Sequence, residues 1–515
     1  MKSSLNLEFT EEATFFGRSR VLLIVTLALL FSAALGLRLL QFTEPPLDYH
    51  PTRQLRGALI SRALYYQWLP SADPATRAIA IDSAKGEPEY EPPILDALVA
   101  LSYLAIGGEN LWLGRMWSII FWLVGGWFVF LLARRITSSD GGVIAVAYYL
   151  FLPLGVIASR SFQPDALMVM LLVITTYALL RWSDERTWAW AIAAGLSAGL
   201  TVLVKGRPLP IIAALLAGVM LSMGKPRNTL RDVKVWSILG LAALIPAIYY
   251  VGTVGSGTAG YLKAYSTGLA DLLLEPAFYV RWMNSFDRLL YLNLAFLGVA
   301  GIVLLQRRAR GLMLGLWFGY ILYGLALPYT IYTHDYYNLP AVPIVGLSLA
   351  PLAALLLARV ARLHISWQVF VVVAGLSLLG FRAWLVRSGI MGTDYYAEPA
   401  GWIAMGEDLP AQGSIIGLTH DYGARVAYYG KRSVAVWPTG QDYAFYALQG
   451  GNQGSFDEEF EARAVGYDYF LVTLMGEFEN QPLLKQKLFD QFPLASEGDG
   501  YLLFDLRPAS ESSES

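Results

Sequence analysis

The chain has 515 residues, of which 56% are hydrophobic and only 15% charged, and its mean hydropathy is +0.46. Because soluble domains carry about 25% charged residues, this composition excludes an ordinary water-soluble protein. The net charge of −2 argues against a nucleic-acid-binding protein. The absence of cysteine excludes disulfides, thiolate catalysis and cysteine-ligated metal centres.

The N-terminal segment, residues 1–20, is polar and is followed by a long apolar run at 21–42. This run is too long for the apolar region of a cleavable signal and lacks a small-residue cleavage site. We therefore expect 1–20 to be a cytoplasmic N-terminus and 21–42 to remain as a membrane anchor.

Apolar stretches recur along the chain as far as residue 387. A stretch of roughly 17–25 apolar residues is long enough to cross the hydrocarbon core of a bilayer. The sequence therefore predicts a polytopic α-helical membrane protein with about eleven spans, and with a transmembrane domain over 21–387. The predicted spans are 21–42, 112–133, 142–158, 166–182, 188–204, 208–223, 235–254, 288–305, 311–328, 339–357 and 366–386.

Positive charge alternates between the turns that join these spans. The turns that begin at Arg134, Lys225 and Arg307 are rich in Lys and Arg, whereas the turn 329–338 has none. Because basic residues concentrate on the cytoplasmic side, this pattern places the N-terminus inside. We expect the protein to lie in the cell (plasma) membrane. An odd number of spans then puts residues 388–515 on its extracytoplasmic side.

Two long segments between spans are predicted to lie outside. Residues 43–111 contain an apolar stretch, 94–106, which is too short to span and is predicted to be an interfacial helix. Residues 255–287 begin with a Gly-rich sequence, for which we expect a mobile start.

The C-terminal domain, 388–515, differs from the rest in charge and pattern. It carries 7 Lys/Arg against 19 Asp/Glu, whereas residues 1–387 carry 31 against 21. Strand-like and helix-like segments alternate in it, which predicts an extracytoplasmic α/β domain. Its acidity suits an accessory domain that binds or orients a partner that is not a polyanion. The predicted strands are 414–420, 433–438, 469–474 and 501–506, and the predicted helices are 422–430, 458–466 and 481–492.

Polar residues gather at the predicted outer side directly after the first span. Arginine offers bidentate donors to phosphate oxygens, and a carboxylate takes a proton from an attacking hydroxyl. An ordinary hydrated juxtamembrane loop explains these charges equally well. Further along, Glu91 is a candidate metal ligand or substrate contact, although an acid near a helix start also favours the helix dipole. The candidates in the first group are Asp48, His50, Arg53 and Arg56.

Three later turns add candidates on the same side. Asp165 follows Pro164 at the start of a span, where helix capping is the alternative role. Lys205 and Arg207 interrupt an apolar hairpin, where they either snorkel to the surface or hold a phosphate. The turn before the tenth span contributes His334, Tyr336 and Tyr337, among aromatics that are also normal at an interface.

Taken in order, these features resemble the GT-C glycosyltransferases, in the branch of the dolichyl-phosphate-mannose protein mannosyltransferases and the aminoarabinose transferase of lipid A. The resemblance covers about 20–360, and the tail sequences AYYGKR and YFLVT are similar to those of bacterial members. It rests on an early acid, the double proline after Glu91, the turn with Ser159, Arg160, Pro164 and Asp165, the hairpin VLVKGRPLP and the turn HDYYNLPAVP.

The resemblance implies an inverting transfer of a hexosyl or pentosyl group from a polyprenyl-phosphate sugar to a hydroxyl acceptor on the outer face. Asp48 matches the position of the catalytic base and Asp165 that of a second acid. Arg160, Lys205, Arg207, His334, Tyr336 and Tyr337 fall within the matching motifs. The acceptor, whether lipid, protein or glycan, stays open, as does the use of a divalent metal ion. The candidate metal ligands are Asp48, Glu91, Asp165 and His334.

Two other functions fit a polytopic membrane protein. A lipid or sugar transporter or flippase would place ionisable residues near mid-span, often with internal repeats, whereas here the acids lie at span ends. A non-catalytic membrane scaffold would use its tail for partners. In both cases the chain would contact membrane lipids and no nucleic acid.

Overall fold

A computed structural model describes residues 14–87, 91–224, 226–252, 264–451 and 454–508. The chain divides into two compact units. Unit 1 comprises 1–42, 89–94 and 115–392, and unit 2 comprises 43–88, 95–114 and 393–515. Most of the first outer segment and the C-terminal domain therefore form one compact unit. The sequence-based prediction assigned them to two separate domains.

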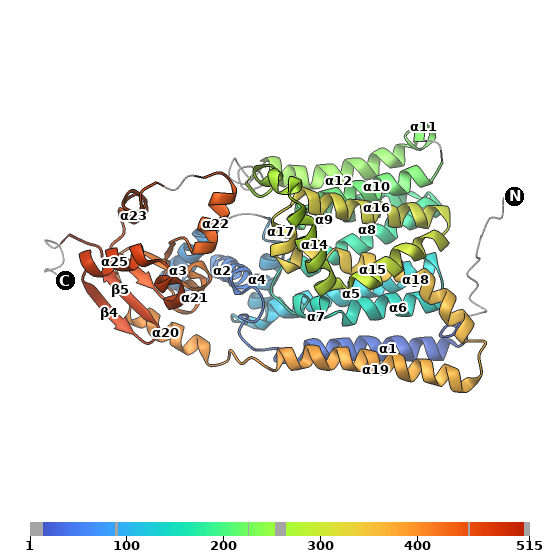
Figure 1. Ribbon diagram of the computed structural model, residues 1–515, viewed down its shortest axis with the longest axis horizontal. Helices are drawn as coiled ribbons and strands as arrows, with labels where there is room; N and C mark the ends of the chain where they lie inside the picture. Colours follow the sequence, from blue (N-terminus) through green and yellow to red (C-terminus); the bar gives the residue numbers. More distant parts are fainter. Residues whose placement is uncertain (1–13, 88–90, 225, 253–263, 452–453, 509–515) are drawn as a thin grey trace. The chain divides into compact units, whose positions relative to one another are not determined.

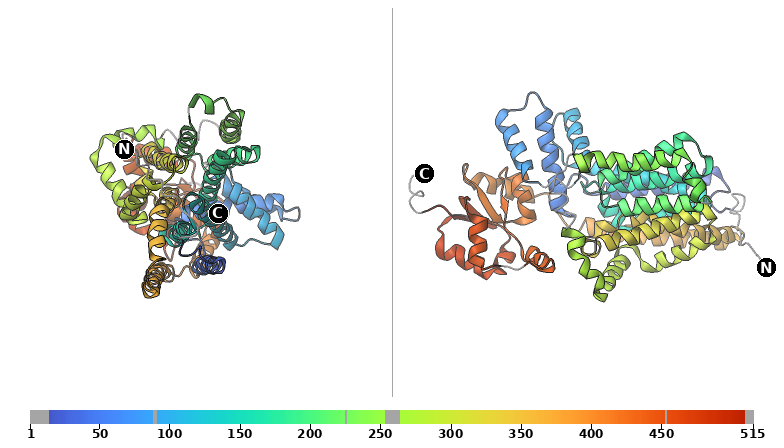
Figure 2. Two further views of the ribbon diagram at one scale, coloured as in Figure 1. Left: turned by 90° about the vertical axis from the view of Figure 1, so that its right-hand side faces the viewer. Right: turned by 90° about the horizontal axis from the view of Figure 1, so that it is seen from above.

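Unit 1 is a bundle of helices that run side by side in Figure 1 and are seen end-on in the left view of Figure 2. Within the described residues, seven helices are long and apolar enough to cross a membrane, or eight if one bent pair is a single span. The predicted fold class is confirmed, while the count of eleven stays a prediction. The longer helices are α1 (Arg20–Arg38), α5 (Trp112–Ile136), α8 (Asp165–Glu185), α9 (Trp188–Val204), α10 (Leu209–Ser222), α12 (Val233–Gly252), α14 (Pro276–Leu290), α16 (Arg307–Ala326), α18 (Ala341–Val360) and α19 (Ile365–Ile390).

Two predicted spans are interrupted. The span predicted at 142–158 is divided into α6 (Ser139–Phe151) and α7 (Pro153–Ala158), because Pro153 lacks the N–H that would continue the helix. The span predicted at 288–305 is broken near its start, since α14 and the helices after Tyr291 meet at a bend of 86°. Tyr291 has a φ of 60°, and Asp287 Oδ1 accepts the N–H of Leu292 at the start of the next helix. The shorter elements are α15 (Leu292–Gly301), α11 (Pro226–Thr229), α17 (Thr330–Thr333), η2 (Thr267–Leu274), η3 (Ile302–Leu304) and η4 (Asp335–Asn338).

The Gly-rich start of the second outer segment lies outside the described residues, and the rest of that segment forms η2 and most of α14.

Close helix packing fixes the positions of α10 and α16. A Cβ at Gly315 would lie 2.7 Å from the carbonyl oxygen of Ala214, and one at Gly319 would lie 2.6 Å from Cα of Ile211. On the facing helix, a Cβ at Gly218 would lie 2.4 Å from the carbonyl oxygen of Gly311. Small residues let membrane helices approach this closely, so α10, which directly follows the Lys205–Arg207 hairpin, is held against α16.

Helices α1 and α19 lie side by side at one edge of unit 1 (Figures 1 and 2). Both contact α7, in a cluster formed by Leu37, Val156, Val386 and Ile390. Only 6% of the most apolar window of each helix is buried. Their long apolar faces therefore suit contact with lipid.

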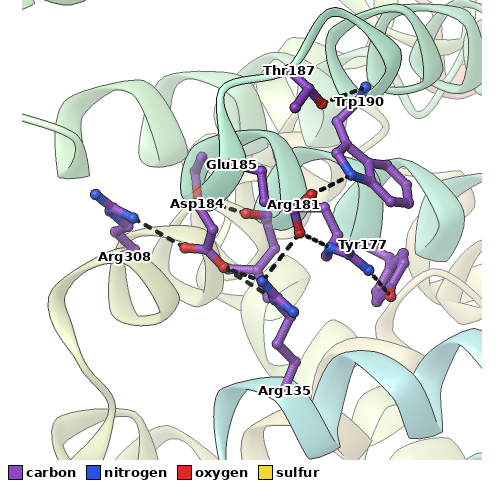
Figure 3. A network of polar contacts seen from close by, with 10 residues as sticks. Arg135, Tyr177, Arg181, Asp184, Glu185, Thr187, Trp190 and Arg308 are labelled. Carbon is purple, nitrogen blue, oxygen red and sulfur yellow. Dashed lines mark hydrogen bonds and ion pairs between the residues drawn. The ribbon is translucent and has the colours of Figure 1, made fainter.

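An ion-pair network joins the helix ends near the α8–α9 turn (Figure 3). Asp184 pairs with Arg135 at 3.0 Å and with Arg308 at 3.1 Å, and so connects α8 with α5 and α16. Glu185 pairs with Arg181 at 2.6 Å and accepts the indole N–H of Trp190. Because α8 has 21 residues, this network lies about 30 Å along the helix from Asp165.

Unit 2 contains a mixed five-stranded sheet in the order β2-β1-β3-β5-β4. Strand β1 is parallel to β2 and β3, whereas β5 is antiparallel to β3 and β4. The predicted α/β tail is confirmed, although the strand at 494–498 was not predicted. The elements are β1 (Ile415–Leu418), β2 (Ala435–Val436), β3 (Tyr469–Val472), β4 (Leu494–Gly498), β5 (Tyr501–Asp505), η5 (His420–Gly423), α20 (Glu398–Asp408), α21 (Ala424–Tyr429), α22 (Gly440–Leu448), α23 (Phe456–Ala464), α24 (Met475–Glu479) and α25 (Pro482–Gln491).

The sheet buries apolar side chains on both faces. Strands β1 and β3 are buried at every residue, as expected for continuous apolar runs between two layers. Trp437 is 1% exposed and packs against Phe460 and Phe470 on one face, while Trp402 and Val426 pack on the other.

The first outer segment adds helices to unit 2. The predicted helix at 94–106 is confirmed as α4 (Ile94–Ile106), and two helices that were not predicted, α2 (Pro51–Trp68) and α3 (Pro74–Lys85), precede it. The Thr52 hydroxyl donates to Asp421 at 3.1 Å, which ties the start of α2 to the turn that follows β1.

Candidate functional site

The centre of the candidate site in unit 1 is a buried ion pair. Lys205 Nζ donates to both carboxylate oxygens of Asp165, at 2.7 and 2.8 Å. Asp165 is the first residue of α8, and Lys205 is the residue that follows α9. Because α8 and α9 form an antiparallel hairpin, residues 40 positions apart meet at one end of it.

The pair is enclosed by protein. The side chains of Lys205 and Asp165 are 5% and 3% exposed. Removing one partner of a buried pair leaves an uncompensated charge, which typically costs about 3–5 kcal/mol. A buried pair is weak evidence for stability in itself, but at a span end it is a candidate functional group.

Aromatic rings from a third segment face this pair. Lys205 Nζ lies 5.0 Å from the ring centre of Tyr336 and 5.9 Å from that of Tyr337. The guanidinium of Arg207 lies 4.7 Å from the ring of Tyr337. His334 completes the group, with its ring 5.6 Å from that of Tyr336 and 6.0 Å from that of Tyr337. Three of the predicted turns therefore meet at one place in unit 1.

Asn338 fixes the turn that carries these rings. Its side chain is fully buried, accepts the hydroxyl of Tyr320 at 2.5 Å and donates to the carbonyl oxygen of Ile331 at 2.9 Å. Since Tyr320 lies on α16, the turn is anchored to the same helix that packs against α10. Asn338 was not among the predicted site residues, and its place in the HDYYNLP motif was the only signal for it.

Glu91 and Arg160 lie in unit 1 in different settings. Glu91 is half-buried and interacts electrostatically with the Tyr250 hydroxyl, as does Arg207. Arg160 is buried, and its Nη2 donates to the carbonyl oxygens of Leu40 at 2.5 Å and Gln41 at 3.2 Å. These bonds tie the end of the first span to the turn before α8, which is a structural task.

The remaining candidates lie in unit 2 at the start of α2. Asp48 is half-buried, and its Oδ1 accepts the side-chain amide of Gln54 at 3.1 Å. Gln54 is fully buried and also donates to the carbonyl oxygen of Tyr49 at 2.8 Å. His50 precedes α2 with a φ of 48°, a left-handed conformation that turns the chain sharply before Pro51. Gln54 therefore holds the Asp48 carboxylate in one orientation.

Arg53 and Arg56 share the first turns of α2 and face an acid that the sequence analysis missed. Burial raises the pKa of the Glu87 carboxyl above its usual value, and the charges of Arg56 and Arg53 act in the opposite direction. Nothing in the sequence around Glu87 distinguished it from other loop acids, since its partners lie more than thirty positions away.

Among the described residues, no group of three or more His, Asp or Glu side chains is arranged to hold a metal ion. Beside Asp165, the ammonium of Lys205 occupies the position that a cation would take. Within the part of the chain that the structure describes, the four candidate ligands therefore do not gather into a group of this kind.

Residues 90–250 match the family model of dolichyl-phosphate-mannose-protein mannosyltransferase. No curated protein matches the chain. ArnT from Cupriavidus metallidurans, solved with undecaprenyl phosphate, is similar in structure, with a TM-score of 0.54 and 15% identity over 93% of this chain and 97% of that one.

Two further solved structures are similar. An oligosaccharyltransferase of Archaeoglobus fulgidus, in complex with zinc and sulfate, has a TM-score of 0.57 and 14% identity over 90% of this chain and 69% of that one. The arabinofuranosyltransferase AftD from Mycobacteria has a TM-score of 0.50 and 16% identity over 95% of this chain and 40% of that one. At these identities the similarity shows a shared fold.

Proposed function

We infer, from the family-model match over residues 90–250 and from the shared fold, that this chain belongs to the GT-C superfamily of membrane glycosyltransferases. From that premise we propose that it transfers a sugar from a polyprenyl-phosphate donor to a hydroxyl acceptor on the outer face of the membrane, with inversion. Structures of two similar proteins were solved with undecaprenyl phosphate and with dolichol-phosphate. A polyprenyl-phosphate donor for this chain is consistent with both.

The observation that carries the proposal is the Lys205 group at the end of the α8–α9 hairpin. A buried ammonium, whose charge Asp165 balances, and the neighbouring Arg207 guanidinium both lie beside Tyr337. Cations placed where negative charge develops stabilise a departing phosphate as its bond to the sugar breaks. Lys205 and Arg207 are thus assigned to the donor phosphate, with Tyr336 and His334 beside them.

Asp165 is assigned to positioning. Both of its carboxylate oxygens already accept from Lys205, so the acid is committed to orienting the ammonium. A pair that is buried and hydrogen-bonded holds its geometry better than an exposed one. This differs from a direct role for Asp165 as a second catalytic acid, which the family resemblance implied.

Asp48 is assigned as the general base. The acceptor oxygen attacks the anomeric carbon, the bond from that carbon to the phosphate oxygen breaks, and polyprenyl phosphate leaves. The hydroxyl proton passes to the Asp48 carboxylate, which Gln54 orients. Attack on the face opposite the leaving phosphate inverts the configuration at the anomeric carbon.

The decisive experiment is to incubate the purified protein with a panel of polyprenyl-phosphate hexoses and pentoses and to measure the release of polyprenyl phosphate. We expect release from one class of donor. A protein that is folded, as judged by its thermal transition, and that releases polyprenyl phosphate from none of the donors would contradict the proposal.

The orientation is tested separately with single cysteines, because the natural chain has none. Ser455→Cys in the tail should react with an impermeant thiol reagent in intact cells. Asn228→Cys in α11, within a predicted inner turn, should react only after lysis. The reverse pattern would place the tail and the proposed acceptor reaction on the cytoplasmic side.

A further inference from the structure

Unit 2 contains a cavity of about 610 Å³ that the proposed catalytic residues do not use. It lies between the helices of the first outer segment, α20 and the end of α21. Its volume falls in the range of small-ligand sites, about 300–1,000 Å³. The polar and aromatic residues on its wall are Arg62, Glu407, Tyr428, Tyr429, Lys431 and Arg432.

One part of the wall is rigid and its charge is balanced. Arg62 pairs with Glu109 at 2.8 Å, donates to the carbonyl oxygen of Tyr428 at 2.6 Å and stacks its guanidinium 3.6 Å from the centre of that ring. The Tyr428 hydroxyl donates to Glu109 at 3.2 Å. The donors of Arg62 are therefore largely used inside the protein, and this residue acts as a fixed aromatic and cationic wall.

Arg432 is in a different state. Its Nη1 donates to the carbonyl oxygen of Ala411 at 2.7 Å. Its Nε and Nη2 are buried, and neither has a hydrogen-bond partner among the described residues. Burial lowers the pKa of this guanidinium below its usual value. A buried donor without a partner destabilises the folded protein by about 1–3 kcal/mol, and by more when it is charged. A ligand that supplied an acceptor to Arg432 would remove this penalty.

The two nitrogens without partners are adjacent on one side of the guanidinium. Nε and Nη2 form the fork that binds a carboxylate or phosphate through two parallel hydrogen bonds. Nη1 is held on the other side by Ala411, so a ligand reaches the fork only when the guanidinium gives up that bond and turns toward the cavity.

The backbone around Arg432 is held in an unusual conformation. Lys431 has a φ of 55°, which non-glycine residues adopt only when the surrounding structure compensates. A Cβ at Gly406 would lie 2.3 Å from Cα of Gly430, so α20 and this loop approach closely. The close contact keeps Lys431 and Arg432 on the cavity wall.

We propose that this cavity binds an oxyanion-bearing sugar of the acceptor, with Arg432 gripping its carboxylate or phosphate and Tyr429 contacting the ring. This assignment rests on the proposed function, since it names the acceptor of that transfer. A cavity of this size suits one or two sugar rings. The surrounding tail has 19 acidic residues against 7 basic ones, so it favours a ligand with a single anionic group over a polyanion.

The test measures binding to the purified full-length protein by calorimetry, with three probes. Galacturonic acid carries one carboxylate, glucose 6-phosphate carries one phosphate group, and maltose is neutral. We expect one of the anionic sugars to bind at least tenfold more tightly than maltose, and which one binds identifies the anion. Equal binding of maltose would overturn the proposal.

Variants connect the binding to Arg432. Arg432→Gln should weaken the anionic sugar at least tenfold, and Arg432→Lys should recover little, because an ammonium has no fork. Arg463→Gln is the matched control, since Arg463 lies on α23 and pairs with Glu459. Retention of wild-type affinity in Arg432→Gln would overturn the proposal.

Transfer assays separate this proposal from the one it rests on. With an identified donor, Arg432→Gln should raise the acceptor KM and leave the donor KM unchanged. An equal rise in both would overturn the role of the cavity in acceptor binding. If the anionic sugar binds through Arg432 but no donor is turned over, the glycosyltransferase proposal fails and with it the acceptor role, while the oxyanion site stands.

Discussion

The two ends of the α8–α9 hairpin carry ion pairs of the same chemistry in contrasting settings. At one end a single pair, Asp165 and Lys205, is almost fully buried. At the other end Asp184 and Glu185 share several arginines, and these side chains are between a quarter and a half exposed (Figure 3). At the first end Lys205 pairs with Asp165, whereas at the second end each acid pairs with two arginines.

This difference separates a buried pair that takes part in the proposed function from an exposed network that holds helix ends together. An exposed pair contributes about 0–1 kcal/mol, and in a network one lost partner is replaced by another. A buried pair lacks that tolerance, because either charge alone would be left without compensation. Removal of one charge is therefore expected to destabilise the hairpin most at the Asp165–Lys205 end, where Arg207 and the aromatic turn also lie.

The largest loss of turnover is expected for substitution of Asp48. This variant serves as the reference for a loss of chemistry without a loss of stability. Asp48→Asn keeps the shape of the side chain and removes the proton acceptor, so turnover should fall ~10²–10⁴-fold. Donor binding and the thermal transition should stay near those of the wild type. Near-normal turnover of Asp48→Asn with an identified donor would show that Asp48 is not the general base.

Breaking the buried pair should affect both folding and donor use. Lys205→Met should reduce the free energy of unfolding by about 3–5 kcal/mol, because Asp165 is left buried without its cation. The double variant Asp165→Asn/Lys205→Met should recover most of that stability but not donor turnover. Turnover restored by the double variant would show that the pair has a structural role only.

Arg207 should separate donor binding from stability. Arg207→Ala should weaken donor binding about tenfold or somewhat more, since a hydrogen bond to a charged group contributes about 1.5–3 kcal/mol. Arg281→Ala, which removes a cation 5.8 Å from the ring of Tyr332, is the matched control and should leave donor KM unchanged. Equal effects of the two variants would mean that Arg207 contributes only to the general charge of the surface.

The smallest effect is expected in the exposed network. Arg308→Ala should lower the unfolding free energy by less than about 1 kcal/mol, because Asp184 keeps Arg135. The loss should shrink further at high salt, which screens exposed charges. A loss as large as that of Lys205→Met, measured by thermal melting in the same detergent, would remove the contrast between the two ends.

The sequence by itself determined the class of the fold, and it predicted a common side for the candidate residues. Apolar length predicted membrane helices, and alternation predicted the α/β tail, because both follow from local periodicity. The antiparallel arrangement of the spans at 166–182 and 188–204 already placed Asp165 and Lys205 at one end. Topology alone supplies that information, since each span reverses the direction of the chain.

Only the tertiary structure decided which residues meet. Lys205 had several acids on its predicted side, and the choice of Asp165 depends on how α8 and α9 pack. Gln54, Glu87 and Asn338 escaped notice because a polar residue becomes informative only when its burial and partners are known. The break at Tyr291 was hidden for the same reason. A local apolar pattern does not record a left-handed φ that neighbouring side chains, here Asp287, stabilise.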